Sequence, residues 1–172
     1  MTPAVRHAGS VAAWAGLLAL QYGVAVAYLS RGTWWHYLLH QMVGWGAGLA
    51  LAALVASFTR YRIPAVVALI GGQLLSIAPD LQFRYQRMPH VASMDLYLGH
   101  ISIHTGPSPT LVGLGCVLLG GTAYLAAEHA RRRLAVVAAV AAAALVLVAC
   151  LLAFPVPSTL AEFPVDTPPA AG

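Results

Sequence analysis

Long apolar runs alternate with short polar stretches along this chain, and the pattern predicts helices that cross a membrane. Five runs stand out, at residues 11–29, 37–58, 64–78, 110–127 and 134–154. A helix needs about 20 apolar residues to cross the hydrocarbon core, so four of the runs are long enough to span. The third is shorter and includes Gln73 and Ser76, which fits either a short tilted span or a re-entrant segment. Pro64 favours a helix start there, and Pro79 is expected to mark its end.

The composition agrees with this pattern. Apolar residues make up 60% of the 172 residues and charged residues 8%, whereas about 25% of residues are charged in soluble domains. We therefore predict an all-α, polytopic integral membrane bundle of about five transmembrane helices. Residues 1–155 form a single membrane domain, and residues 156–172 form a proline-rich, flexible C-terminal tail. The first run also resembles a signal peptide, but it is counted here as a span.

Small residues within the runs suggest how the helices pack. Gly44 and Gly48 follow the small-x3-small pattern, which allows two helix backbones to approach closely. We expect this pair to pack inside the protein's own bundle rather than in a dimer interface. Cys116 and Cys150 lie in apolar runs, where we expect small buried side chains and no disulfide bond.

The arginines predict the orientation, provided that all five runs span. Six of them then share one side and three share the other; the six are Arg6, Arg60, Arg62, Arg131, Arg132 and Arg133. Cytoplasmic loops carry the excess of basic residues, so the N-terminus is expected in the cytoplasm and the C-terminus outside, in a plasma (inner) membrane. The mild positive charge is explained by these loops. With no basic stripe interleaved with aromatics, we expect the lipid bilayer as a partner, with other membrane subunits or a homo-oligomer also open, and no nucleic acid.

Histidines gather in two short stretches of this apolar chain, and the five-span topology puts both stretches on the outer side together with Asp80. The five residues are His36, His40, His90, His100 and His104. Two of the pairs, 36/40 and 100/104, have i,i+4 spacing, which places both imidazoles on one side of a helix. His90 follows a proline in a loop and is an optional member.

The loop between the third and fourth runs, residues 79–109, is long enough to indicate a function. Within it we predict a short interfacial helix near 93–104, with Ser93 as its N-cap and Gly106 at its stop. On such a helix His100 and His104 share a face. Asp95 would point about 140° away from His100, so it is a weaker ligand candidate.

Imidazole nitrogens and a carboxylate oxygen are ligands that suit zinc and related divalent ions. Three such ligands and an open position would make a bound water acidic enough to act as a nucleophile near neutral pH, which is the chemistry of hydrolysis. Other interpretations of the histidines remain open. The histidines could serve hydrogen bonds only, one from each pair could ligate haem, or copper could bind with Met42, Met88 or Met94.

The order of these elements resembles the bacterial membrane-bound metal-dependent hydrolases. The likeness covers about residues 36–110: a histidine at the start of a span, the sequence Ser-Ile-Ala-Pro-Asp ending at Asp80, and Gly-His-Ile-Ser-Ile-His ending at His104. The family typically has Pro-Asp-x-Asp and Gly-His-Arg-Gly-x-Thr-His-Ser. Here Gln82 replaces the second aspartate, the histidine spacing is four rather than five, and no later His-x3-Asp follows.

The resemblance implies a metal-dependent hydrolase whose ligands are His40, Asp80, His100 and His104, with His36 as a supporting or alternative ligand. Because the site opens at the membrane surface, the expected substrate is lipidic or presented there. The alternative is a non-enzymatic subunit of a membrane complex, either structural or carrying haem or copper for electron transfer.

Overall fold

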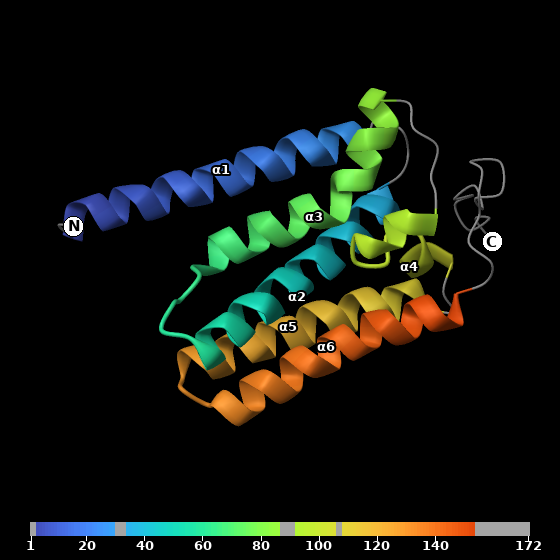
Figure 1. The fold of residues 1–172 in the computed structure, drawn as a ribbon. Coiled ribbons are helices and arrows are strands. Elements are labelled where there is room, and N and C mark those ends of the chain that lie inside the picture. Colours follow the sequence, from blue (N-terminus) through green and yellow to red (C-terminus); the bar gives the residue numbers. More distant parts are fainter. Residues whose placement is uncertain (1–2, 30–33, 87–91, 106–107, 154–172) are drawn as a thin grey trace, which may run out of the picture.

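The chain is all-helical in a computed structural model (Figure 1). The structure describes residues 3–29, 34–86, 92–105 and 108–153, and the side chains within 9–29, 34–81, 94–104 and 108–153. The helices are α1 (Pro3–Leu29), α2 (Trp34–Phe58), α3 (Ala65–Gln86), the 3-10 helix η1 (Ala92–Leu96), α4 (Ser102–Thr105), α5 (Pro109–Glu128) and α6 (Arg132–Leu152). The predicted tail, His90 and Met88 lie outside the described residues.

Within the described residues, four helices are long and apolar enough to cross a membrane, and they lie in α1, α2, α5 and α6. The apolar part of α3, Ala65–Leu81, is shorter. It nevertheless runs antiparallel to α2: Gly44 lies against Gly72, and Gly48 lies against Ala68. The third run therefore carries the chain back along α2 to the other end of the bundle, and the expected helical membrane bundle is confirmed.

Pro79 does not end the third helix, which corrects the expectation from the sequence. α3 continues to Gln86 with Pro79 buried in its interior, and Figure 1 shows the helix changing direction along its length. Proline has no N–H to donate and its ring crowds the carbonyl four residues earlier, so it bends a helix that neighbouring contacts hold together. Asp80 follows directly after this proline.

α2 is the central helix, and glycines allow its neighbours to approach closely. Gly44 and Gly48 face α3, which confirms that this pair packs inside the bundle, whereas Gly46 faces α5. A Cβ atom at Gly46 would collide with the carbonyl of Cys116. Alanines form the contact of α2, α5 and α6, with Ala53, Ala123 and Ala139 among the most buried. Without a hydrophobic effect between helices in lipid, such close packing is what stabilises the bundle.

The glycine contact of α2 with α5 can be tested by one added methyl group. We expect Gly46→Ala to lower the free energy of unfolding by about 1–3 kcal/mol, because two backbones must separate to admit it. Gly71→Ala is the matched control, since a Cβ at Gly71 meets nothing within 4 Å. Denaturant unfolding in detergent measures both. Equal stabilities for the two variants would contradict the close packing.

α1 lies at the edge of the bundle and is joined to it through polar side chains. Gln21 accepts hydrogen bonds from the Tyr37 hydroxyl at 2.6 Å and the Gln41 amide at 2.8 Å, and it also bonds with Gln73 of α3. Most of the other α1 side chains that the structure describes, such as Leu18 and Tyr22, are exposed. Hydrogen bonds between polar side chains hold helices together in a membrane, so this network attaches α1 to α2 and α3.

Candidate metal site

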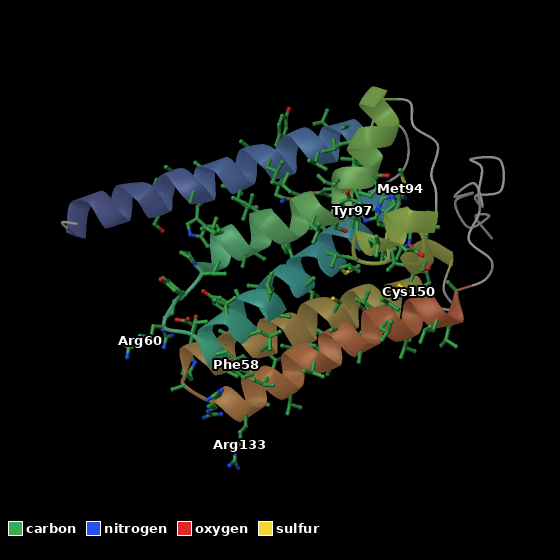
Figure 2. All side chains as sticks on the ribbon, viewed as in Figure 1. Phe58, Arg60, Met94, Tyr97, Arg133 and Cys150 are labelled. Atoms are coloured by element: carbon green, nitrogen blue, oxygen red, sulfur yellow. The ribbon has the colours of Figure 1, made fainter. Side chains whose placement is uncertain are left out.

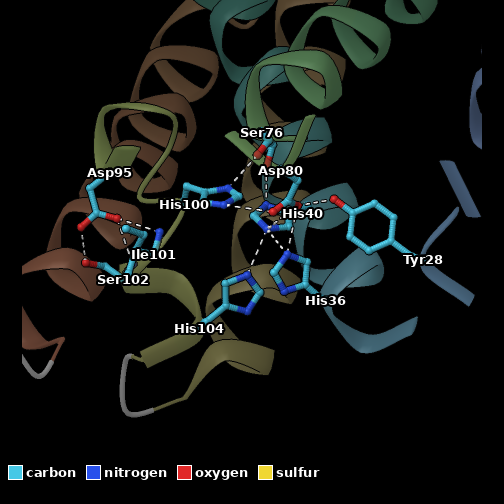
Figure 3. Close-up of polar contacts among 10 residues, drawn as sticks. All are labelled: Tyr28, His36, His40, Ser76, Asp80, Asp95, His100, Ile101, Ser102 and His104. Atoms are coloured by element: carbon cyan, nitrogen blue, oxygen red, sulfur yellow. Dashed lines mark hydrogen bonds and ion pairs between the residues drawn. The ribbon is translucent and has the colours of Figure 1, made fainter. Parts of the chain in front are cut away.

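The structure brings five of the sequence-predicted ligands together at one end of the bundle (Figure 3). His36 and His40 come from the first turns of α2, Asp80 comes from α3, and His100 and His104 come from the segment between η1 and α5. The i,i+4 pair on α2 presents both rings to one side, with centroids 4.6 Å apart. The two histidine stretches therefore lie side by side with Asp80, as the five-span topology predicts.

The ligand atoms converge on one small volume. The Nε2 atom of His40 lies 3.1 Å from that of His36 and 3.0 Å from that of His104. The Asp80 carboxylate lies 3.0 Å from His36 Nε2 and 3.3 Å from His100 Nε2. Tetrahedral zinc with bonds of about 2.0–2.1 Å would hold its ligand atoms about 3.3 Å apart. His36, His40, Asp80 and His100 could thus hold a metal ion, since their ligand atoms all lie within 4.8 Å of one another.

Burial differs across the cluster. His40 and His100 are 0% and 1% exposed, whereas the side chains of His36 and Asp80 are 21% and 17% exposed. The group therefore has a closed side within the bundle and a side that solvent or a substrate can reach.

Ser76 orients the two buried histidines. Its hydroxyl lies 2.9 Å from His40 Nδ1, and its carbonyl oxygen lies 3.1 Å from His100 Nδ1. A carbonyl only accepts, so His100 must carry a hydrogen on Nδ1. A hydrogen bond of this kind on the outer nitrogen directs the other nitrogen toward a metal.

The contacts inside the cluster call for positive charge. With one hydrogen of His100 on Nδ1, its Nε2 can lie 3.3 Å from the Asp80 carboxylate favourably if it carries a second hydrogen or if both atoms bind a shared cation. Around His40, a single hydrogen on Nε2 can serve only one of its two neighbours, His36 and His104. A metal cation shared by these atoms would account for their close approach, because an imidazole nitrogen without a hydrogen and a carboxylate oxygen can each donate a lone pair to it.

The segment that carries His100 and His104 is not the continuous helix predicted for 93–104. η1 ends at Leu96, and α4 begins only at Ser102. Between them Leu98 and Gly99 have positive φ angles of 60° and 71°, a left-handed conformation that breaks a right-handed helix. His100 thus lies in a turn. The proposed cap Ser93 and stop Gly106 lie outside the residues whose side chains are described.

Asp95 holds this turn together rather than pointing at the ligands. Its carboxylate accepts hydrogen bonds from the backbone N–H of Ile101 at 2.8 Å, from that of Ser102 at 2.9 Å and from the Ser102 hydroxyl at 2.6 Å. Ile101 and Ser102 lie between His100 and His104 in the chain. The carboxylate therefore fixes the backbone from which both loop histidines project.

We expect Asp95→Ala to loosen the turn. Two buried N–H groups would lose their acceptor, at a cost of about 1–3 kcal/mol for each unsatisfied group. Amide hydrogen exchange of Ile101 and Ser102 should then be at least about tenfold faster. Asp95→Asn is the control, because its amide oxygen can still accept both N–H groups. Unchanged exchange in the alanine variant would show that Asp95 does not hold the turn.

Sequence reasoning missed two residues that contact the cluster. Ser76 lies one helical turn before Asp80, an i,i+4 spacing that could have identified it. Tyr28, at the end of α1, donates a hydrogen bond to the Asp80 carboxylate and stacks on His36 with centroids 5.5 Å apart. No sequence spacing links Tyr28 to the cluster, because the contact depends on how α1 packs.

Of the methionines considered as copper ligands, Met42 packs against Gly113 of α5, and Met94 is buried. Cys116 and Cys150 are free thiols. His129 caps α5 and contacts the carbonyl of Leu125.

No protein-family model, curated protein or solved structure matches this chain.

Proposed function

We propose that the protein is a zinc-binding membrane protein whose outward-facing His/Asp site hydrolyses a lipidic or membrane-surface substrate. The observation that carries the proposal is the convergence of four imidazole Nε2 atoms and one carboxylate. Nitrogen and oxygen ligands at this spacing favour zinc. His40, Asp80, His100 and His104 would hold the ion, with His36 as a supporting or alternative ligand, and the ion would supply Lewis acidity for hydrolysis.

The chain's own residues have defined tasks in this proposal. Ser76 keeps the rings of His40 and His100 in place, and Tyr28 holds the Asp80 carboxylate. The exposed edges of His36 and Asp80 are where a substrate would approach.

Two features support a lipidic substrate. Trp34, at the start of α2 and two residues before His36, is 53% exposed, as expected of a tryptophan at the membrane–water interface. An apolar pocket of about 270 Å³ lies between α2, α5 and α6, and Leu98, two residues before His100, lines it. The segment that carries the loop histidines thus also borders space suited to an acyl chain.

Zinc is favoured over the other metals considered from the sequence. Copper sites commonly add a soft sulfur ligand, whereas the atoms that converge here are imidazole nitrogens and carboxylate oxygens. Haem needs its two axial histidines on opposite sides of a macrocycle, whereas His36 and His104 stack directly on each other with centroids 4.1 Å apart. A subunit role in a membrane complex is compatible with the same metal site.

The orientation belongs to the proposal as well. Arg60, Arg62 and the arginines that begin α6 lie at the end of the bundle opposite the histidines. By the excess of positive charge this end is cytoplasmic, which puts the N-terminus inside and the C-terminus outside an inner membrane.

The activity can be tested directly in lipid. The protein is reconstituted with zinc in vesicles of phosphatidylglycerol and phosphatidylethanolamine, and the lipids are analysed by mass spectrometry. We expect hydrolysis products with the zinc-loaded protein and none with His100→Ala/His104→Ala. No product, or the same product from the double variant, would rule out these lipids as substrates of this site.

A further inference from the structure

The end of the bundle opposite the histidines is strongly basic. Figure 2 labels Phe58, Arg60 and Arg133 there, where α2 ends and α6 begins. Glu128 is the acidic side chain described at this end, and it pairs with Arg62 at 3.1 Å. In the described part of the chain, the remaining arginines here have no acidic partner; they are Arg60, Arg131, Arg132 and Arg133.

An open pocket of about 500 Å³ lies beside two of these arginines. It is lined by Phe58, Arg132, Arg133, Val136 and Val137. The Arg132 guanidinium lies over the Phe58 ring, 4.8 Å from its centroid, which fixes one cation at the pocket.

The pocket lining is charged at one end and apolar at the other, as a phospholipid is. Val136 and Val137 each follow an arginine by four residues on α6, so they lie about 6 Å deeper along the same side of the helix. Phe58 and Val137 are 63% and 66% exposed and extend the apolar wall. The pocket is therefore cationic at its outer rim and apolar further in.

We propose that this pocket binds an anionic phospholipid, with the phosphate on Arg132 and Arg133 and an acyl chain along Val136 and Val137. The two unpaired cations complement the phosphate charge, and the valines and Phe58 complement the chain. A free phosphate would leave the apolar wall unused, and a lipid of zero net charge would leave the cationic excess uncompensated. The site is distinct from the metal cluster and does not depend on it.

The excess of basic residues at a cytoplasmic end accounts for the arginines but not for a pocket that binds lipid. The test must therefore distinguish binding in the pocket from general attraction to the charge at this end. The full-length protein in detergent is titrated with dioleoyl phosphatidylglycerol and retained lipid is counted by native mass spectrometry. Arg132→Gln/Arg133→Gln removes the two pocket cations. Arg60→Gln/Arg131→Gln removes the same charge at the same end outside the pocket and is the matched control.

We expect the pocket variant to bind phosphatidylglycerol about 25-fold more weakly, since each arginine near a membrane surface contributes about fivefold. The control variant should lose at most about fivefold, and dioleoyl phosphatidylcholine should bind far less than phosphatidylglycerol. Equal losses in both variants, equal binding of both lipids, or displacement of phosphatidylglycerol by inorganic phosphate would each overturn the proposal.

Discussion

Replacing His40 with alanine should reduce zinc affinity more than any other single change in this protein. His40 is fully buried, and its Nε2 lies within 3.1 Å of the Nε2 atoms of both His36 and His104. Removing it deletes a ligand from the centre of the group and leaves the neighbouring nitrogens without their shared partner. Removing a residue that only supports a ligand lowers metal affinity about 10- to 100-fold. We expect His40→Ala to lower zinc affinity by more than that.

A series of variants distinguishes the loss of a zinc ligand from a general loss of structure. Ser76→Ala removes only the hydroxyl beside His40 Nδ1 and should cost about 10- to 100-fold in affinity. His129→Ala removes an exposed histidine at the C-terminal cap of α5 and should leave the affinity unchanged. Competition with a zinc indicator measures the zinc affinity of the three variants, and circular dichroism checks that their helices persist. If His40→Ala and His129→Ala bound zinc alike, His40 would not be a ligand.

Removing the metal should destabilise the whole bundle. The cluster joins α2, α3 and the loop before α5, and the unfolded chain does not hold these ligands together. An ion that binds only the folded state stabilises it by about 4 kcal/mol when its free concentration is 1,000 times the dissociation constant. Chelation with EDTA should abolish that gain, as measured by denaturant unfolding of the zinc-loaded and stripped protein.

The control for this effect is the same comparison in His40→Ala. A variant that cannot hold the ion should have the same unfolding free energy with and without the chelator. A chelator effect of equal size in both proteins would mean that the stabilising ion binds somewhere else.

Hydrophobic patterning was enough to predict the helices, because in a membrane each span must satisfy its own backbone hydrogen bonds. Pro79 misled because its local effect, which ends helices in water, is outweighed here by the contacts that hold α3 together. The predicted helix at 93–104 failed for the opposite reason. Its apolar spacing suited a helix, but Asp95 stabilises a turn through Leu98 and Gly99 instead.

The candidate site was predictable where its residues share an element or a bundle end. His36 and His40 share a helix face, and the count of spans places Asp80 beside them. Tyr28 was not predictable, because its contact with Asp80 depends on the packing of α1. The interlocking contacts of His100 with Ser76 and Asp80 also appear only in three dimensions.

The metal content of the purified protein tests the central claim most directly. The wild-type chain and His100→Ala/His104→Ala are loaded with zinc, freed of excess ion by gel filtration, and analysed by inductively coupled plasma mass spectrometry. The cluster predicts a stoichiometric ion in the wild-type chain and a content near zero in the double variant. Wild-type protein without stoichiometric metal, or equal metal in both proteins, would contradict a metal site built from these histidines and Asp80.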